Sequence, residues 1–139
     1  MIRELVRDEV LLSKPCEPAT AEDAELAEDL VDTLLSIDDA AGLAANQIGA
    51  AKAVIVFRDE RENPQVMYNP KILLGLNGFK TEESCLTRDE VSKVTRYQKI
   101  KVQYQVLQEG TLRTRKRDYT GWTAQVIQHM VDHCKGKLV

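Results

Sequence analysis

The chain has 139 residues, of which 43% are hydrophobic and 29% are charged, and its formal net charge is −3. This length and composition predict a single globular domain over residues 1–139 and argue against a general nucleic-acid binder. No apolar run is long enough to span a membrane and the N-terminus shows no signal-peptide pattern, so we expect a cytoplasmic protein that does not bind membranes.

The first half of the chain predicts one helix followed by extended segments. Residues 5–12 form a short apolar-rich stretch, and Pro15 and Pro18 prevent a helix from continuing past it. Thr20 offers an N-cap, and leucines every three or four residues predict an amphipathic helix that ends near Asp38. Three further segments are expected: a packed turn or strand over 40–49, a buried strand over 53–57, and an extended segment over 66–74 interrupted at Asn69-Pro70.

The second half predicts a hairpin and a final helix. Apolar and polar residues alternate over 100–106, which is typical of a half-buried strand, and Glu109-Gly110 predicts a turn. Residues 112–119 would return as the partner strand, and residues 120–133 have an apolar helical face. Strands between two helices, joined mostly by short turns, predict an α+β fold.

The only two histidines of the chain, His129 and His133, are four residues apart on the predicted final helix. This spacing puts both imidazoles on one helix face, as two ligands of one metal ion require. A pair of polar residues on a solvated face is the alternative interpretation. Cys85 is the leading third ligand because it lies in the polar stretch 82–87, which is expected to be loop-like. Three protein ligands with an open fourth position are typical of catalytic metal sites.

The other two cysteines are weaker candidates for a ligand. Cys16 lies between two prolines without a partner motif, and Cys134 groups with Met130 and Val126 on the apolar helix face, which favours a core thiol. Three cysteines without a secretory signal argue against a disulfide framework.

Three segments together resemble the motifs of the peptide deformylase family. They are Ala40-Ala-Gly-Leu-Ala-Ala-Asn-Gln47, Glu83-Ser-Cys-Leu-Thr87 and Gln128-His-Met-Val-Asp-His133. The resemblance implies an α+β fold of mixed antiparallel strands around a C-terminal metal-binding helix. It also implies a metal-dependent hydrolase that removes the formyl group from N-formylmethionyl peptides.

The resemblance implies roles for particular residues. Cys85, His129 and His133 would bind the metal, usually Fe²⁺ in that family, with Zn²⁺, Ni²⁺ or Co²⁺ as substitutes. The Gln47 side chain and the Leu86 backbone N–H would donate hydrogen bonds to the developing oxyanion. A buried amide that bonds the backbone is the alternative interpretation of Gln47. The residues expected to contact the peptide substrate are Gly42, Leu43, Ala44 and Ser84.

The most consequential departure from the family pattern is Met130, which occupies the position of the catalytic Glu. That Glu acts as general base and acid, and a thioether can do neither, so we expect strongly reduced activity. Glu82 and Glu83 are weak candidates for a substitute base, whereas Asp132 is expected to anchor an ion pair with Arg96. The alternative functions are a non-catalytic module that binds metal and peptide for sensing or regulation, and a purely structural metal site.

Two smaller departures and one charged patch complete the sequence predictions. Ala40 and Ser84 replace family glycines and can alter the loop or narrow the substrate groove. Four cationic residues on the predicted hairpin are expected to form a solvated strand face, with docking to an anionic partner as the alternative: Arg113, Arg115, Lys116 and Arg117. A formylmethionyl peptide substrate would be compatible with docking to the ribosome, but no motif in the sequence supports such docking.

Overall fold

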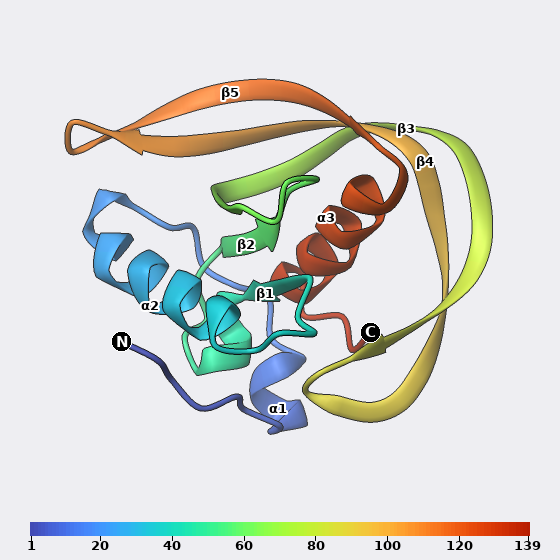
Figure 1. The fold of residues 1–139 in the computed structure, drawn as a ribbon, viewed down its shortest axis with the longest axis horizontal. Coiled ribbons are helices and arrows are strands. Elements are labelled where there is room, and N and C mark those ends of the chain that lie inside the picture. Colours follow the sequence, from blue (N-terminus) through green and yellow to red (C-terminus); the bar gives the residue numbers. More distant parts are fainter.

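A computed structural model describes all residues, 1–139, and confirms the predicted α+β class (Figure 1). The five strands form one antiparallel sheet in chain order: β1 (Gly42–Ala44), β2 (Val54–Arg58), β3 (Pro64–Cys85), β4 (Arg88–Gln108) and β5 (Thr111–Thr120). The helices are α1 (Glu9–Leu12), α2 (Ala24–Leu35) and α3 (Gly121–Cys134), with short 3₁₀ turns η1 (Ala21–Asp23) and η2 (Ala45–Ile48). None of these helices has the length and apolar character needed to cross a membrane.

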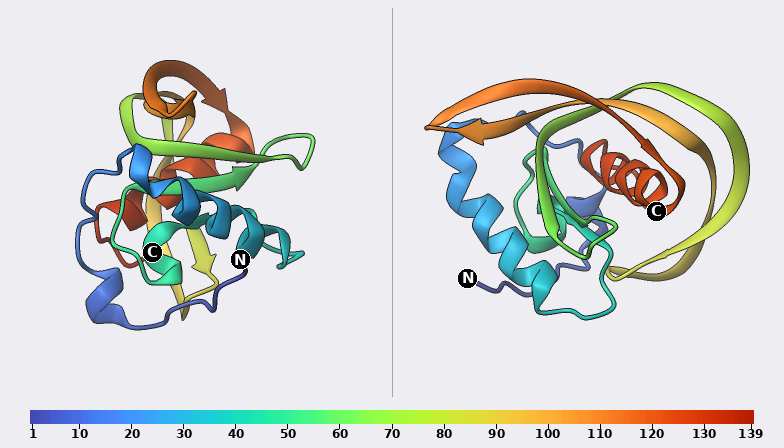
Figure 2. Two further views of the ribbon diagram at one scale, coloured as in Figure 1. Left: turned by 90° about the vertical axis from the view of Figure 1, so that its left-hand side faces the viewer. Right: turned by 45° about the horizontal axis from the view of Figure 1, so that its top comes forward.

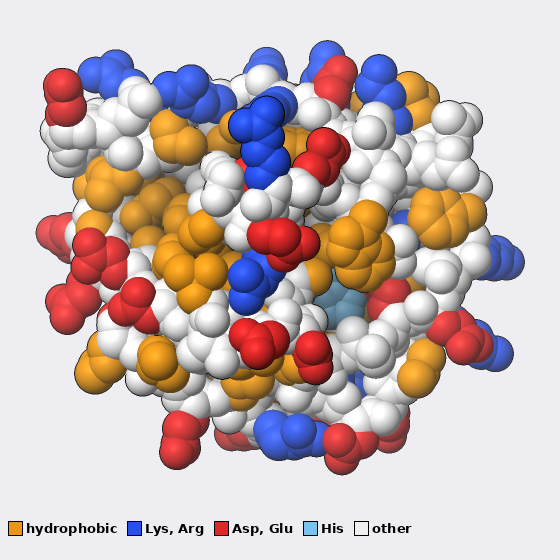
Figure 3. All heavy atoms as spheres, in the orientation of Figure 1, with side chains coloured by type: hydrophobic (Ala, Val, Ile, Leu, Met, Phe, Trp, Pro, Cys, Tyr) orange, Lys and Arg blue, Asp and Glu red, His pale blue; other side chains and the backbone are white.

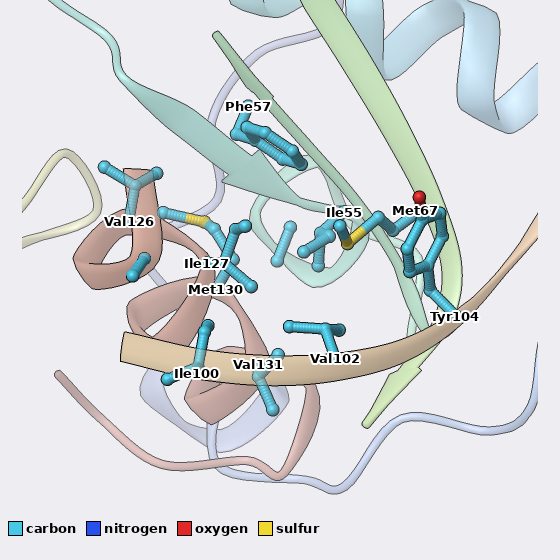
Figure 4. Close-up of a cluster of buried hydrophobic side chains, with 12 residues drawn as sticks. Ile55, Phe57, Met67, Ile100, Val102, Tyr104, Val126, Ile127, Met130 and Val131 are labelled. Atoms are coloured by element: carbon cyan, nitrogen blue, oxygen red, sulfur yellow. The ribbon is translucent and has the colours of Figure 1, made fainter. Parts of the chain in front are cut away.

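The buried strand β2 separates two hydrophobic cores. Ile55 and Phe57 face α3, whereas Val54 and Val56 face α2. Because side chains alternate across a strand, a strand covered on both faces needs apolar residues at every position. The continuous apolar run in the sequence is therefore explained by a helix packed on each side of β2, and the core on the α3 side is shown in Figure 4.

Helix α2 begins where the sequence predicts and ends earlier than predicted. The Thr20 hydroxyl accepts a hydrogen bond from the Glu22 N–H at 3.2 Å, and the Asp23 carboxylate accepts one from the Thr20 N–H at 2.8 Å. This reciprocal capping box satisfies backbone donors at the helix start. The helix ends at Leu35 and not near Asp38, because the chain tightens into a turn that leads to β1.

The strands β3 and β4 are longer than the sequence predicts. They pair from Tyr68 opposite Gln105 to Cys85 opposite Arg88, and the two strands curl around α3 (Figures 1 and 2). β3 passes through Asn69-Pro70 by a shift in register instead of ending there. Most residues of the distal ribbon are partly or fully exposed, so its strands carry no clear burial period. The stretch 82–87, expected to be a loop, is the end of β3 followed by the tight turn at the ribbon tip.

The last hairpin and the final helix follow the prediction closely. Glu109 and Gly110 both have positive φ, 52° and 78°, which suits a two-residue hairpin turn between β4 and β5. β5 then leads into α3, which lies inside the curl of the sheet (Figure 2). The end of β3 is thereby brought to the buried face of α3.

Candidate metal centre

Three metal-type donors meet between the end of β3 and the C-terminal half of α3. The Nε2 atoms of His129 and His133 are 3.1 Å apart, and the Cys85 Sγ is 3.4 Å from the His133 Nε2. All three donor atoms lie within 4.8 Å of one another. A tetrahedral site with ordinary ligand distances has N···N and N···S edges of about 3.4 and 3.6 Å, so these residues fit one transition-metal ion.

A buried carboxylate fixes the orientation of His129. The His129 Nδ1 lies 2.8 Å from the Glu83 Oε1, and the Glu83 carboxylate also accepts from Arg96 and from the Gln125 amide. An ionised carboxylate can only accept, so His129 donates from Nδ1 and leaves the Nε2 lone pair for a ligand bond. Glu83 is therefore a positioning residue for the candidate metal centre.

The charges around this carboxylate form a closed network. Burial raises the pKa of Glu83, but hydrogen bonds from His129, Arg96 and Gln125 outweigh it and lower the pKa to about 2. The Arg96 Nη1 donates to the Asp132 carboxylate at 2.7 Å, as the sequence predicted for this pair. Glu83 is thus already engaged and is not available as a substitute base, whereas Glu82, the other candidate, lines the pocket beside the centre.

Cys85 and His129 shift each other's pKa in opposite directions. Burial raises the pKa of Cys85, but hydrogen bonds from His129 and His133 lower it to about 5. Burial lowers the pKa of His129, but its hydrogen bonds to Cys85 and Glu83 raise it to about 9. Cys85 is therefore held as a thiolate at neutral pH, which is the form that binds metals.

Gln47 lies on η2 directly beside this cluster. Its Nε2 is 3.2 Å from the Cys85 Sγ and 3.3 Å from the Thr87 Oγ1, and its Oε1 accepts from the Ala44 N–H at 2.9 Å. The side-chain oxygen of Gln47 accepts a backbone hydrogen bond, so its NH₂ group is the end that faces the candidate metal centre. Leu86 follows Cys85 in the turn at the ribbon tip, with its side chain 37% exposed.

A pocket of about 380 Å³ is lined by Cys85 and His129, whereas His133 is 1% exposed and does not line it. A histidine is visible in a hollow on this face in Figure 3.

Of the residues expected to contact a peptide, Gly42 and Ser84 line the pocket. Leu43 and Ala44 do not, because their side chains are fully buried in the two cores. Both residues are 0% exposed as a whole, main chain included, and the Ala44 N–H already donates to the Gln47 Oε1.

Met130 lines the same pocket and is only 6% exposed. It lies with Val126 and Ile127 on the α3 face that packs against β2 (Figure 4). A Cβ placed on Gly42 would come within 3.3 Å of the Met130 Cγ, so the thioether fills the space beside β1. The position next to His129 therefore carries an apolar side chain and no proton acceptor.

Two residues of the pocket were missed by the sequence reasoning. Gln125 donates to the Glu83 Oε2 at 2.9 Å, and Trp122 stands 66% exposed at the pocket rim. Both precede His129 by helical spacings that put them on its face of α3. That spacing could have identified both residues as neighbours of His129 from the sequence.

The fold and the cysteine–histidine cluster define a small α+β protein with one candidate metal centre. The sequence pattern of the polypeptide deformylase family matches residues 3–139. A peptide deformylase of Clostridium beijerinckii is 37% identical over 140 residues, which cover 100% of both chains. Peptide deformylase 2 of Vibrio cholerae is 37% identical over 81% of this chain and 67% of its own length.

Solved structures give the same result. A class I type b peptide deformylase from Acinetobacter baumannii, bound to Met-Ala-Ser, superposes with a TM-score of 0.85 at 27% identity over 99% of this chain and 97% of that chain. The peptide deformylase from Thermus thermophilus gives a TM-score of 0.84 at 28% identity, over 99% of this chain and 83% of that chain. The chain belongs to the peptide deformylase family.

Proposed function

We propose that this protein binds one divalent transition-metal ion at Cys85, His129 and His133 and accepts the formylated N-terminus of a methionyl peptide, which it deformylates slowly. The observation that carries the proposal is Met130 in an otherwise complete site. Fe²⁺ is the metal we expect, and Zn²⁺, Ni²⁺ and Co²⁺ suit the same mixed thiolate and imidazole donors.

Strand β1 offers the peptide a place to bind. β1 is the first strand in the order of the sheet and pairs only with β2, and Gly42 lines the pocket, so the main chain at Gly42 is where an extended peptide can form hydrogen bonds. Gly42 has no side chain to obstruct this approach and lines the pocket. The Acinetobacter baumannii relative bound to Met-Ala-Ser supports a peptide ligand.

The donors around the pocket suit an amide carbonyl. A divalent ion held by the three ligands would polarise the carbonyl and lower the pKa of a water molecule. Gln47 presents its amide group 3.2 Å from the Cys85 Sγ, and the Leu86 N–H follows directly in the chain. Two preset donors can stabilise negative charge that develops on the formyl oxygen.

The site lacks a residue at position 130 that can transfer protons. Met130 can neither take a proton from the attacking water nor give one to the leaving amine. Glu83 is engaged by His129, Arg96 and Gln125, and Asp132 by Arg96. Since general acid–base catalysis contributes about 10²–10⁴-fold, we expect the rate to be reduced by a factor of this order.

The test is an anaerobic assay of formate release from formyl-Met-Ala-Ser by the Fe²⁺- or Ni²⁺-loaded protein. We expect Met130→Glu to raise kcat/KM by about 10²–10⁴-fold over wild type. Met130→Gln is the matched control, because it has a similar size without a proton acceptor and should bring no gain. Cys85→Ala should abolish turnover in the Met130→Glu background. A wild type as fast as Met130→Glu would refute the role given to Met130.

A non-catalytic binding role is the second candidate, favoured by the burial of Met130 beside an intact pocket. Saturable binding of formyl-Met-Ala-Ser by the metal-loaded wild type, without release of formate, would support it. Loss of that binding in Cys85→Ala would link the peptide to the metal centre. Absence of both binding and turnover would exclude formyl-Met peptides as the ligand.

A further inference from the structure

Two cysteines outside the metal centre lie side by side although they are far apart in sequence. Cys16 follows α1, and Cys134 is the last residue of α3. The Cys16 N–H donates to the Cys134 carbonyl oxygen at 2.8 Å. Both residues are partly exposed and neither is part of a disulfide. The structure therefore pairs two thiols that sequence reasoning treated separately.

We propose that Cys16 and Cys134 are a redox-active pair that forms a reversible disulfide. The bond would link the N-terminal arm, defined as residues 13–20 between α1 and η1, to the end of α3. This inference is independent of the proposed catalytic function.

The backbone contact limits the distance that the bond must span. With an N···O separation of 2.8 Å, ordinary bond lengths keep the two Cα atoms at most about 6.7 Å apart. Native disulfides span Cα distances of about 4.4–6.8 Å. The Cys134 side chain lowers the pKa of Cys16, which requires the two side chains to lie close together. The pair can close without a rearrangement of the chain.

The surrounding packing holds both cysteines in place. The Glu17 N–H donates to the Ala51 carbonyl at 2.9 Å, which ties the arm to the segment before β2. On the other side, a Cβ placed on Gly136 would come within 2.6 Å of the Ser13 carbonyl oxygen. The arm is thus closely packed against the end of α3, which keeps Cys16 and Cys134 next to each other.

The third cysteine is separate from this pair. The Cys85 Sγ contacts Gln47, Thr87 and His133 and lies within the candidate metal centre. A metal bound there would occupy its thiolate. Oxidation should therefore consume Cys16 and Cys134 and spare Cys85.

The oxidant is a small-molecule disulfide such as oxidised glutathione. The partly exposed Cys16 sulfur attacks one glutathione sulfur, the S–S bond of glutathione breaks, and one glutathione thiolate leaves. The Cys134 thiolate then attacks the Cys16 sulfur of this mixed disulfide and displaces the second glutathione. Two protein thiols are oxidised, one molecule of glutathione disulfide is reduced to two thiols, and the two thiol protons end on the released glutathiones.

The test is a thiol count and peptide mapping of the reduced, metal-loaded full chain after incubation with oxidised glutathione. We expect free thiols to fall from three to one, a mass loss of about 2 Da from two hydrogen atoms, and a cross-linked peptide that contains Cys16 and Cys134. Cys85→Ser, the matched control, should still lose two thiols. Cys16→Ser and Cys134→Ser should form no intramolecular disulfide. Three free thiols, a stable glutathione adduct on Cys16, or a cross-link to Cys85 would overturn the proposal.

A melting experiment tests whether the disulfide fits the native fold. The bond would close a loop of more than 100 residues, so the oxidised protein should melt at least about 5 °C above the reduced protein. Cys16→Ser treated in the same way should show no shift. A disulfide that forms but lowers Tm would mean that the fold must distort to make it, which would also overturn the proposal.

Discussion

Arg96 supports the candidate metal centre although it contacts none of the three metal-ligating residues; it acts through Glu83, which contacts His129. It is 4% exposed and makes ion pairs at 2.7 Å with both Glu83 and Asp132. We expect Arg96→Met to lower the free energy of unfolding by roughly 3–5 kcal/mol, because the buried Glu83 carboxylate loses its countercharge. Since Glu83 positions His129, metal affinity should fall by about 10–100-fold. Urea denaturation and a metal titration measure the two effects.

The control for this substitution is an exposed ion pair of the same sheet. The Lys99 Nζ lies 3.9 Å from the Asp118 carboxylate, and both side chains are about half exposed. Lys99→Met should change stability by less than about 1 kcal/mol and leave metal affinity unchanged. Equal effects of the two substitutions would mean that burial of Arg96 does not matter.

The sequence predicted these residues unevenly. The two histidines were found because helical spacing fixes which side chains share a face. The pair Arg96–Asp132 was also named in advance, although it joins β4 to α3 and does not follow from helical spacing. The hydrogen bond from His129 to Glu83 was not found, since it joins α3 to the far end of β3. Contacts between distant segments depend on the path of the sheet, and one sequence does not contain that path.

At the scale of elements, the close packing of the α3 end on the N-terminal arm makes Gly136 critical. Gly136 has φ of 78°, and an added Cβ would lie 2.6 Å from the Ser13 carbonyl oxygen. Gly136→Ala should therefore destabilise the protein by about 2–4 kcal/mol, from backbone strain and from steric overlap. The midpoint of urea denaturation measures the change.

Gly110, in the turn between β4 and β5, is the matched control because it has the same φ of 78° with nothing within 4 Å of an added Cβ. Gly110→Ala should cost only the backbone term, about 1–2 kcal/mol. If both substitutions cost the same, the contact between the arm and α3 contributes nothing. The difference between the two variants isolates the steric part.

Element prediction worked where burial is periodic and failed where it is not. Helices α2 and α3, strand β2 and the turn at Glu109-Gly110 were predicted because their apolar pattern or turn chemistry is local. The distal parts of β3 and β4 were missed because they are held by pairing with each other, with most side chains partly or fully exposed. Cys85 consequently lies at the end of a strand instead of in a free loop.

On the scale of the whole molecule, two cores hold the elements that carry the donors, one on each face of β2. Both cores are built from apolar side chains and need no metal ligand to form. We therefore expect the chelated protein to remain folded, with a cooperative melt at lower temperature than the metal-loaded protein. At a free metal concentration 100 times Kd the ion adds roughly 2.7 kcal/mol, which corresponds to about 5–10 °C in Tm for a chain of this size.

Melting curves with and without metal, for wild type and Cys85→Ser, separate the remaining interpretations. Cys85→Ser should melt near the chelated wild type and show little response to added metal, because it lacks the thiolate that anchors the ion. A chelated wild type that is unfolded at all temperatures would establish a structural metal site. If the Tm of the wild type does not change with added metal, the three donors do not bind the ion, although their spacing matches a tetrahedral site. Stability measured in this way tests the metal centre without any reference to turnover, which Met130 is expected to suppress.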